Sequence, residues 1–284
     1  KYLSLSTNYI VKIEKNAFYS LSYLEYLYLD DNLLENIETY SFNDLNKVIN
    51  NKMLLSHQYI SNVDSYSFNG LLNVPILDLS FNNLVSIKNF TFHGMFTLLE
   101  LILEFNFIRE IDTNALNGLF NLLKLNLKNN RLKTADFLLN QDLKSLEHVN
   151  LDENFVGDLN TDLFKYLDTL KILELRNNKI KFFASNTILA HLNLLDLRLV
   201  SNQIQLIKSN YFKNMILLKY LDLSDNKITR LEQNSFYYLN NLNLLNLAFN
   251  LLSNLSKHLF SSLIKLNKLN LAHNYLYTLD PIIF

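Results

Sequence analysis

The stretch Leu221-Asp-Leu-Ser-Asp-Asn226-Lys-Ile228 decides the fold, because its pattern recurs along the whole 284-residue chain. Its asparagine returns at intervals of 24 residues, with one interruption. The asparagines in this register are Asn8, Asn32, Asn82, Asn106, Asn130, Asn154, Asn178, Asn202, Asn226, Asn250 and Asn274, and Gln58 fills the gap after Asn32. A fixed period of this length indicates one structural unit stacked about twelve times.

Apolar residues hold fixed positions around each asparagine. Leu221 and Leu223 are two residues apart, which is the spacing of a short strand with one buried face. Stacked coils would turn such strands into a parallel sheet with a continuous core. We expect these strands, all in one sheet, at residues 26–29, 76–79, 101–103, 125–127 and the equivalent positions of the other coils.

The recurring asparagine has a structural role in this scheme. The chain must turn inward after each strand, which buries backbone N–H and C=O groups that have no partner in the sheet. A carboxamide both donates and accepts, so a buried column of asparagines can satisfy these groups in coil after coil. Gln58 keeps the same chemical group on a longer stem.

The full pattern, L-x-x-L-x-L-x-x-N-x-L-x-x-L/I-x-x-x-x-F-x-x-L, resembles the leucine-rich repeat in its 24-residue "typical" extracellular subtype. Toll, chaoptin and Slit-type ectodomains carry this subtype. The resemblance covers the whole chain and implies an α/β solenoid. In that family the solenoid is a right-handed horseshoe with a parallel sheet on its concave face. The repeats here are short, so we expect mostly extended or 3₁₀ turns on the convex side.

The resemblance also implies a second buried column, made of phenylalanines on the convex side. These are Phe18, Phe42, Phe68, Phe92, Phe164, Phe212, Phe236, Phe260 and Phe284. Leu116 and Ile188 are conservative replacements in this column, whereas Asn140 is not. We therefore expect residues Lys133–Gln141 to form the least regular convex segment.

Composition agrees with a single repeat array. Hydrophobic residues make up 49% of the chain, yet it has only four glycines and two prolines, and we find no linker. We expect residues 1–284 to form one array of about twelve coils. Repeat arrays need polar caps, and neither end shows one, so we expect an uncapped piece of a longer protein.

Several function classes are disfavoured. The net charge is −1, which gives no broad basic surface for nucleic acid or for an anionic membrane. No apolar run is long enough to insert into a membrane. The chain has no cysteine, and its six histidines lie in scattered registers, with only His148 expected on the concave face. We find no catalytic motif, so we expect a protein that is not an enzyme and uses no cofactor or metal.

Two rows of charged residues should alternate in sign across the sheet. The first row is Glu104, Lys128, Asp152 and Arg176, and the second is Glu174, Arg198 and Asp222. Opposite charges on adjacent strands support a sheet by roughly 0.2–1 kcal/mol per pair. We interpret both rows as structural ladders.

One part of the predicted concave face is apolar. Its outward positions include Tyr26, Tyr28, Leu54, Ile76 and Ile102, which we take as the candidate partner-binding residues. Exposed aromatic and aliphatic groups with a polar fringe are typical of protein interfaces. The alternative is that these side chains only pack across neighbouring strands. Aromatic residues that directly precede the asparagines, such as Phe81, Phe105 and Phe249, should pack at the edge of the sheet.

The same region contains the only break in the period. Gln58 follows Asn32 by 26 residues, so two extra residues enter near Ile49–Lys52. We expect segment 46–58 to leave the regular coil and protrude, while Met53 and Leu55 still point into the core.

Two sequons, at Asn89 and Asn254, match the acceptor pattern for N-glycosylation. Together with the family resemblance they favour an extracellular or cell-surface glycoprotein. We expect a protein-binding module of a receptor, adhesion or innate-immunity ectodomain, with a protein ligand as its partner. A secreted matrix protein and an intracellular scaffold or effector remain as alternatives.

Overall fold

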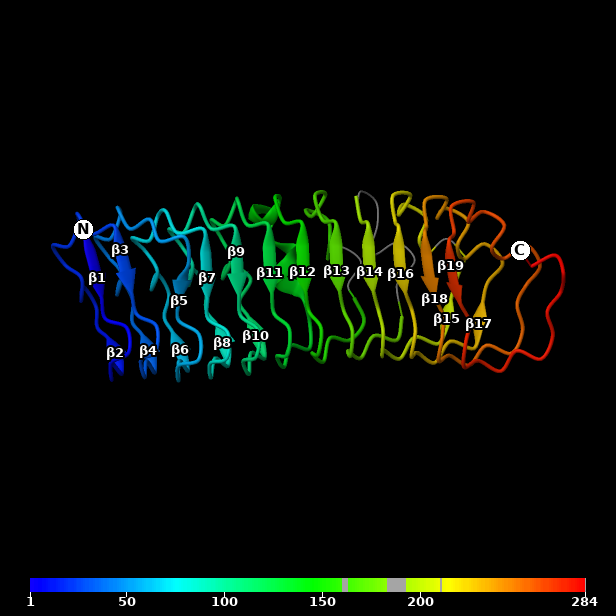
Figure 1. The fold of residues 1–284 in the computed structure, drawn as a ribbon, viewed down its shortest axis with the longest axis horizontal. Helices are drawn as coiled ribbons and strands as arrows, with labels where there is room; N and C mark the ends of the chain where they lie inside the picture. Colours follow the sequence, from blue (N-terminus) through cyan, green and yellow to red (C-terminus); the bar gives the residue numbers. More distant parts are fainter. Residues whose placement is uncertain (160–162, 183–192, 210, 284) are drawn as a thin grey trace. The chain divides into compact units, whose positions relative to one another are not determined.

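The computed structural model describes all residues except 160–162, 183–192, 210 and 284 (Figure 1). The predicted column positions Ile188 and Phe284 lie outside the described residues. The chain divides into two compact units. Unit 1 comprises Lys1–Leu132 with Asp136–Leu146, and unit 2 comprises Lys133–Ala135 with Glu147–Phe284. The single array over residues 1–284 stays a prediction.

Unit 1 has one short strand in each coil at the expected register. These strands are β1 (Tyr2–Ser4), β3 (Tyr26–Tyr28), β5 (Met53–Leu54), β7 (Ile76–Asp78), β9 (Glu100–Ile102) and β11 (Lys124–Asn126). All pairings between them are parallel and join equivalent residues, for example Leu77 with Leu101. The central leucine of each three-residue strand, and Met53 of β5, points into the core, as the spacing of two predicts.

Unit 2 repeats this arrangement. Its strands are β12 (His148–Asn150), β13 (Ile172–Glu174), β14 (Asp196–Arg198), β16 (Tyr220–Asp222), β18 (Leu244–Asn246) and β19 (Lys268–Asn270). Neighbours in this series pair in parallel, so each coil adds one strand to the sheet. The prediction of a parallel-sheet solenoid is confirmed.

The strands end one residue earlier than predicted in all four named coils and start one residue earlier in two. The strands expected at 76–79, 101–103 and 125–127 lie at 76–78, 100–102 and 124–126. A side chain explains the early end: the Asp78 carboxylate accepts the N–H of Ser80 at 3.0 Å, which folds the chain into a local turn. The backbone N–H two residues later donates in the same way to the side-chain oxygens of Asn126, Asn150, Asp222, Asn246 and Asn270.

A second series of two-residue strands, which the sequence did not reveal, lies beyond the asparagines. In unit 1 these are β2 (Lys12–Ile13), β4 (Asn36–Ile37), β6 (Asn62–Val63), β8 (Ser86–Ile87) and β10 (Glu110–Ile111). In unit 2 they are β15 (Leu206–Ile207) and β17 (Arg230–Leu231). They too pair in parallel, in the small sheets β2-β4-β6, β8-β10 and β15-β17, so the returning chain is largely extended.

Helix is confined, in the part of the chain that the structure describes, to two 3₁₀ segments in unit 1. These are η1 (Asp136–Leu139) and η2 (Gln141–Leu143). They fall at the place where Asn140 replaces a phenylalanine. The Asn140 side chain accepts the N–H of Asp142 at 2.9 Å and donates to Asn117 at 2.8 Å, so it caps η2. The expected irregularity of this segment is confirmed.

The phenylalanine column is confirmed at the described positions. In unit 1, ring centroids of Phe18, Phe42, Phe68 and Phe92 stack at 5.8, 5.6 and 5.7 Å. In unit 2, Phe236 stacks between Phe212 at 6.1 Å and Phe260 at 6.0 Å. Offset stacking adds to the stability gained from burying the rings. Leu116 is buried in the same register.

The asparagines of the column join neighbouring coils, except that Asn8 in the first coil bonds to Leu5 and Ser6 of its own coil. Asn178 is 3% exposed, and its Nδ2 donates to the carbonyls of Leu151 at 2.9 Å and Arg176 at 3.0 Å. Its Oδ1 accepts the N–H of Val156 at 2.9 Å. Gln58 does the same, because its amide accepts from Leu34 N–H at 3.2 Å and donates to Leu29 at 3.3 Å.

The residue before each asparagine adopts a left-handed backbone conformation. Phe81, Phe105 and Phe249, for example, have φ of 53°, 53° and 55°. This conformation disfavours bulky side chains, and no glycine occupies the position. The hydrogen bonds of the adjacent asparagine hold the turn in place, so the column fixes the direction of the chain as well as satisfying its polar groups.

We expect Asn178→Leu to lower the free energy of unfolding by more than about 2 kcal/mol, because buried backbone groups of two coils lose their partners. Chemical denaturation followed by circular dichroism measures this change. Asn254→Leu, at an exposed asparagine, is the matched control and should change stability little. Equal midpoints for Asn178→Leu and the wild type would contradict this role of the column.

Candidate functional site

The candidate site lies on the outward side of the strands of unit 1. The five predicted residues, Tyr26, Tyr28, Leu54, Ile76 and Ile102, are here called the apolar face. All five sit on strands β3 to β9 and alternate with residues that point into the core. Tyr26 and Leu54 are each 37% exposed, whereas the other three are half-buried. The structure therefore places every predicted residue on the outward side of the strands.

The apolar face is divided into two parts by a break between strands. β1 and β3 form a sheet of their own, and β5, β7, β9 and β11 belong to another. The expectation of a single sheet is wrong at this point. The two extra residues near Ile49–Lys52 separate β3 from β5, while Met53 and Leu55 remain buried as predicted.

Three tyrosines cluster on the first of these sheets. Tyr2 is 67% exposed, and its ring centroid lies 5.1 Å from that of Tyr28 and 6.5 Å from that of Tyr26. The rings thus pack partly against one another, as the alternative of cross-strand packing predicts. Tyr26 nevertheless remains 37% exposed, so another molecule can contact it.

Apolar and acidic residues alternate on the second sheet. Asp78 lies between Leu54 and Ile102, and Ile76 lies beside Glu100. The Asp78 carboxylate is held by the Ser80 hydroxyl at 2.6 Å and by Lys52 Nζ at 2.9 Å. Burial acts to raise the pKa of Asp78, but these hydrogen bonds outweigh it and keep the pKa below its usual value.

A row of stacked rings borders the apolar face. The ring centroids of His57 and Phe81, and those of Phe81 and Phe105, are 4.4 Å apart. In unit 2, Phe249 stacks on His273 at 4.1 Å. The predicted packing of these phenylalanines at the edge of the sheet is confirmed, because one ring follows another at nearly the spacing of strands.

The outward side of unit 2 carries a network of charges centred on Glu174. The guanidinium of Arg198 pairs with Glu174 and with Asp196, the latter at 2.7 Å. Arg176 lies 3.8 Å from Glu174 and 3.9 Å from Asp152. The predicted pairing along the ladders is therefore present at Arg176 and Arg198. Asp222 serves another purpose, because it accepts from the Ser224 hydroxyl at 2.6 Å.

His148 also joins this network. Its Nε2 lies 3.0 Å from a carboxylate oxygen of Glu174. This hydrogen bond, helped by the charges of Arg198 and Arg176, lowers the pKa of Glu174 despite its burial. Within the described ranges no group of three or more His, Cys, Asp or Glu side chains is arranged to hold a metal ion.

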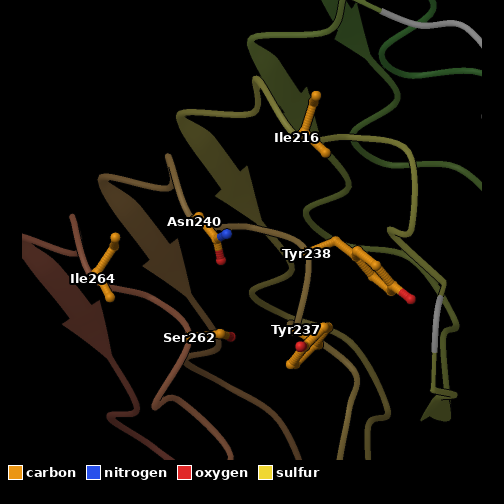
Figure 2. A pocket seen from close by; sticks show the side chains of 6 residues that line it. All are labelled: Ile216, Tyr237, Tyr238, Asn240, Ser262 and Ile264. Carbon is orange, nitrogen blue, oxygen red and sulfur yellow. The ribbon is translucent and has the colours of Figure 1, made fainter.

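Unit 2 also has a pocket of about 290 Å³, which sequence reasoning missed (Figure 2). Its lining residues are Ile216, Tyr237, Tyr238, Asn240, Ser262 and Ile264. Figure 2 shows that they come from three successive coils, on the segments that lead into the strands. Ile264 at its border is 76% exposed, so the pocket is a hollow of the surface and not an enclosed site.

We expect Glu174→Gln to lower the free energy of unfolding at neutral pH by about 1–2 kcal/mol, because charged hydrogen bonds are lost. A lowered pKa means that the stability from Glu174 is present above its unfolded-state pKa and lost as pH falls through the folded value. The difference between variant and wild type should therefore shrink below about pH 5.

Urea denaturation at a series of pH values measures this difference. Glu147→Gln is the matched control, because Glu147 makes an exposed ion pair with Lys171 at 2.6 Å. Exposed pairs contribute little, so this control should change stability by less than about 1 kcal/mol at any pH. A Glu174→Gln difference that stays constant down to pH 2 would contradict the assigned network.

None of the described helices is long and apolar enough to cross a membrane. No curated protein sequence matches the chain. Solved structures do. A leucine-rich-repeat protein of Leptospira interrogans is 26% identical, with a TM-score of 0.77, and the match covers 98% of this chain and 68% of that one.

Two further solved structures are complexes. Toll of Drosophila, solved with Spatzle in a glycosylated form, has a TM-score of 0.84 at 22% identity, and the match covers 98% of this chain. TLR13, solved with the RNA ssRNA13, has a TM-score of 0.68 at 24% identity and 99% coverage. The chain spans only 38% of the Toll chain and 48% of the TLR13 chain, so these likenesses show the fold alone.

The sequence itself matches a family model described as "Leucine rich repeat" at residues 1–48, 144–204 and 192–252. These segments cover more than half of the chain, and the coil geometry in both units agrees with them. This chain belongs to the leucine-rich-repeat family.

Proposed function

We propose that this chain is a non-catalytic protein-binding module that contacts its partner through the apolar face of unit 1. The observation that carries the proposal is the exposure of Tyr26 and Leu54 on strands whose backbone is fixed by the coils on either side. Apolar groups that are ordered before binding lose little conformational entropy when a partner covers them.

The contrast with unit 2 supports the choice of this face. The outward charges around Glu174 already satisfy one another, so a partner that covered them would have to remove water from ion pairs without making better ones. Tyrosine, by comparison, offers a large contact area with few rotamers and a hydroxyl for the polar rim. Glu100, which lies beside Ile76, supplies part of that rim in unit 1.

We further propose that the module belongs to an extracellular or cell-surface receptor, adhesion or innate-immunity protein. The Toll structure supports a protein ligand, because Toll was solved in complex with Spatzle. The sequon at Asn254 supports an extracellular location, because this asparagine is exposed and can carry a glycan. At Asn89 the site is less open: its Oδ1 accepts the N–H of Asn114 at 3.1 Å, and Thr91 is fully buried.

Tyr28→Ala and Ile102→Asp should each weaken binding of a protein partner by at least about 1 kcal/mol, because each removes apolar contact area from the proposed interface. Polypeptides selected for binding from a displayed library provide partners, and calorimetry measures their dissociation constants. Lys124→Ala, an exposed position on β11 of the same sheet, and Arg198→Ala in unit 2 are the controls.

Circular dichroism must show that all four variants fold. The proposal for the apolar face fails if charge changes at Glu104, Lys128, Asp152 and Arg176 abolish binding while Tyr28→Ala and Ile102→Asp do not. In that case the charged ladders, and not the tyrosines, would contact the partner.

The wild-type chain secreted from a eukaryotic cell should carry an N-glycan, which mass spectrometry before and after glycosidase treatment detects. Asn254→Gln should remove most of the added mass, because Asn254 is the more exposed acceptor. Asn89→Gln is the matched control. A secreted chain without sugar at either asparagine would remove this support for an extracellular location.

A further inference from the structure

The break between β3 and β5 leaves part of the β3 backbone without a neighbouring strand. In β3 the carbonyl of Tyr28 and the N–H of Tyr26 face the first coil, where they bond to Leu5 N–H at 2.9 Å and the Lys1 carbonyl at 3.1 Å. Successive residues of a strand point their backbone groups in opposite directions. The N–H and C=O of Leu27, between the two tyrosines, therefore face the break.

A side chain fills the place of the missing strand. Asn50 Oδ1 accepts the Leu27 N–H at 3.0 Å, and Asn50 Nδ2 donates to the Leu27 carbonyl at 2.6 Å. One carboxamide thus makes both hydrogen bonds that two different residues of a parallel neighbouring strand would make. Asn50 is only 3% exposed, so water does not readily replace it.

Asn50 is outside the 24-residue asparagine column and enters with the two extra residues of the insertion. Its neighbour Ile49 donates its backbone N–H to the Glu25 carbonyl at 2.9 Å, which ties the start of the insertion to the same coil. After the insertion, Gln58 Nε2 donates to the Leu29 carbonyl at 3.3 Å. The Gln58 bond is the one that the column makes between other coils, so of these two amides only Asn50 makes connections that backbone pairs make between the other strands.

We propose that Asn50 is a positioning residue that holds β3, and with it Tyr26 and Tyr28, in the orientation that the apolar face requires. Leu27 lies between these tyrosines, so its two bonds to Asn50 fix the backbone from which both rings project. No described strand pairs with β3 on this side, and the Asn50 carboxamide makes the hydrogen bonds in its place. The part of this inference that concerns binding rests on the proposed function, whereas the effect on β3 is measured without a partner.

Amide hydrogen exchange of the whole chain, followed residue by residue by NMR, tests the inference. Asn50→Leu removes both hydrogen bonds, and the Leu27 amide should then exchange faster by about tenfold or more. The amides of Leu101 and Leu125, in the centres of β9 and β11, should keep their wild-type rates. The contact between the Tyr2 and Tyr28 rings, whose centroids lie 5.1 Å apart, should give a cross-peak in the wild type that weakens in the variant.

Asn121→Ala is the matched control. Its Nδ2 also donates to the preceding coil, at 2.7 Å from the Phe96 carbonyl, but far from the break in sequence and on an exposed segment. This variant should leave the exchange rate of Leu27 unchanged.

A second variant keeps the test valid if Asn50→Leu does not fold. Asn50→Asp replaces the amide by an isosteric carboxyl, which cannot donate when it is ionised but can donate and accept when it is protonated. The ratio of variant to wild-type exchange at Leu27 should be large at pH 7 and should fall toward one at about pH 3.

The inference is overturned if Leu27 is as protected in the Asn50 variants as in the wild type. It is also overturned if Leu101 and Leu125 lose as much protection as Leu27, because Asn50 would then only add to overall stability. The two proposals can fail separately. If the Asn50 variants change exchange only at Leu27 while Tyr28→Ala binds partners normally, Asn50 keeps its positioning role and the proposed binding face is wrong.

Discussion

A buried carboxamide that joins each coil to the coil before it is the interaction on which this structure depends. Asn226 shows it clearly: its Nδ2 donates to the carbonyls of Leu199 at 2.8 Å and Leu223 at 3.1 Å. Its Oδ1 accepts the N–H of Ile204 at 3.0 Å. Without these bonds, the inward turn after each strand would bury polar groups unpaired, which costs far more than a hydrogen bond contributes when it is made. The turn also places Asp225 in a left-handed conformation, which the neighbouring bonds maintain.

This repeated turn gives the outward residues of each strand fixed positions. A strand of three residues shows only two side chains to the outside, and the next coil repeats them one strand spacing away. The outward side chains consequently form a regular grid, and the residue types at these two positions of each coil set the chemistry of the surface. In unit 1 these positions hold Tyr26, Leu54 and Ile76, whereas in unit 2 they hold Glu174 and Arg198 as well as Tyr220. A rigid grid suits recognition of another protein, because the ordering of its side chains precedes binding.

The insertion near Asn50 shows how the array tolerates an irregular coil. Two added residues separate two strands, yet the core residues Met53 and Leu55 stay buried, and a single amide completes the backbone of Leu27. The disturbance is therefore confined to the outward side, where it changes the surface that a partner would meet. In a globular core the same insertion would displace side chains in several directions, but a solenoid transmits it only to the adjacent coils.

The sequence by itself determined the repeat, the buried positions and the place of the irregular coil. The period of the repeat and the polarity of its residues are sufficient to predict these features, because together they indicate which residues face the core. Leu223, Phe236 and Asn226 were each assigned to burial in this way, and each is buried. The five residues of the apolar face were located on the correct side of their strands for the same reason.

The tertiary structure alone revealed several bonds across coils that the repeat pattern does not predict. The Leu27 partner lies 23 residues away in Asn50, and the His148 partner lies 26 residues away in Glu174. The separation of β3 from β5, the second series of short strands and the caps made by residues such as Asp78 depend on backbone direction. A hydrophobic pattern carries no record of that direction, because hydrogen bonds between coils are set by the path of the chain and not by the polarity of single residues.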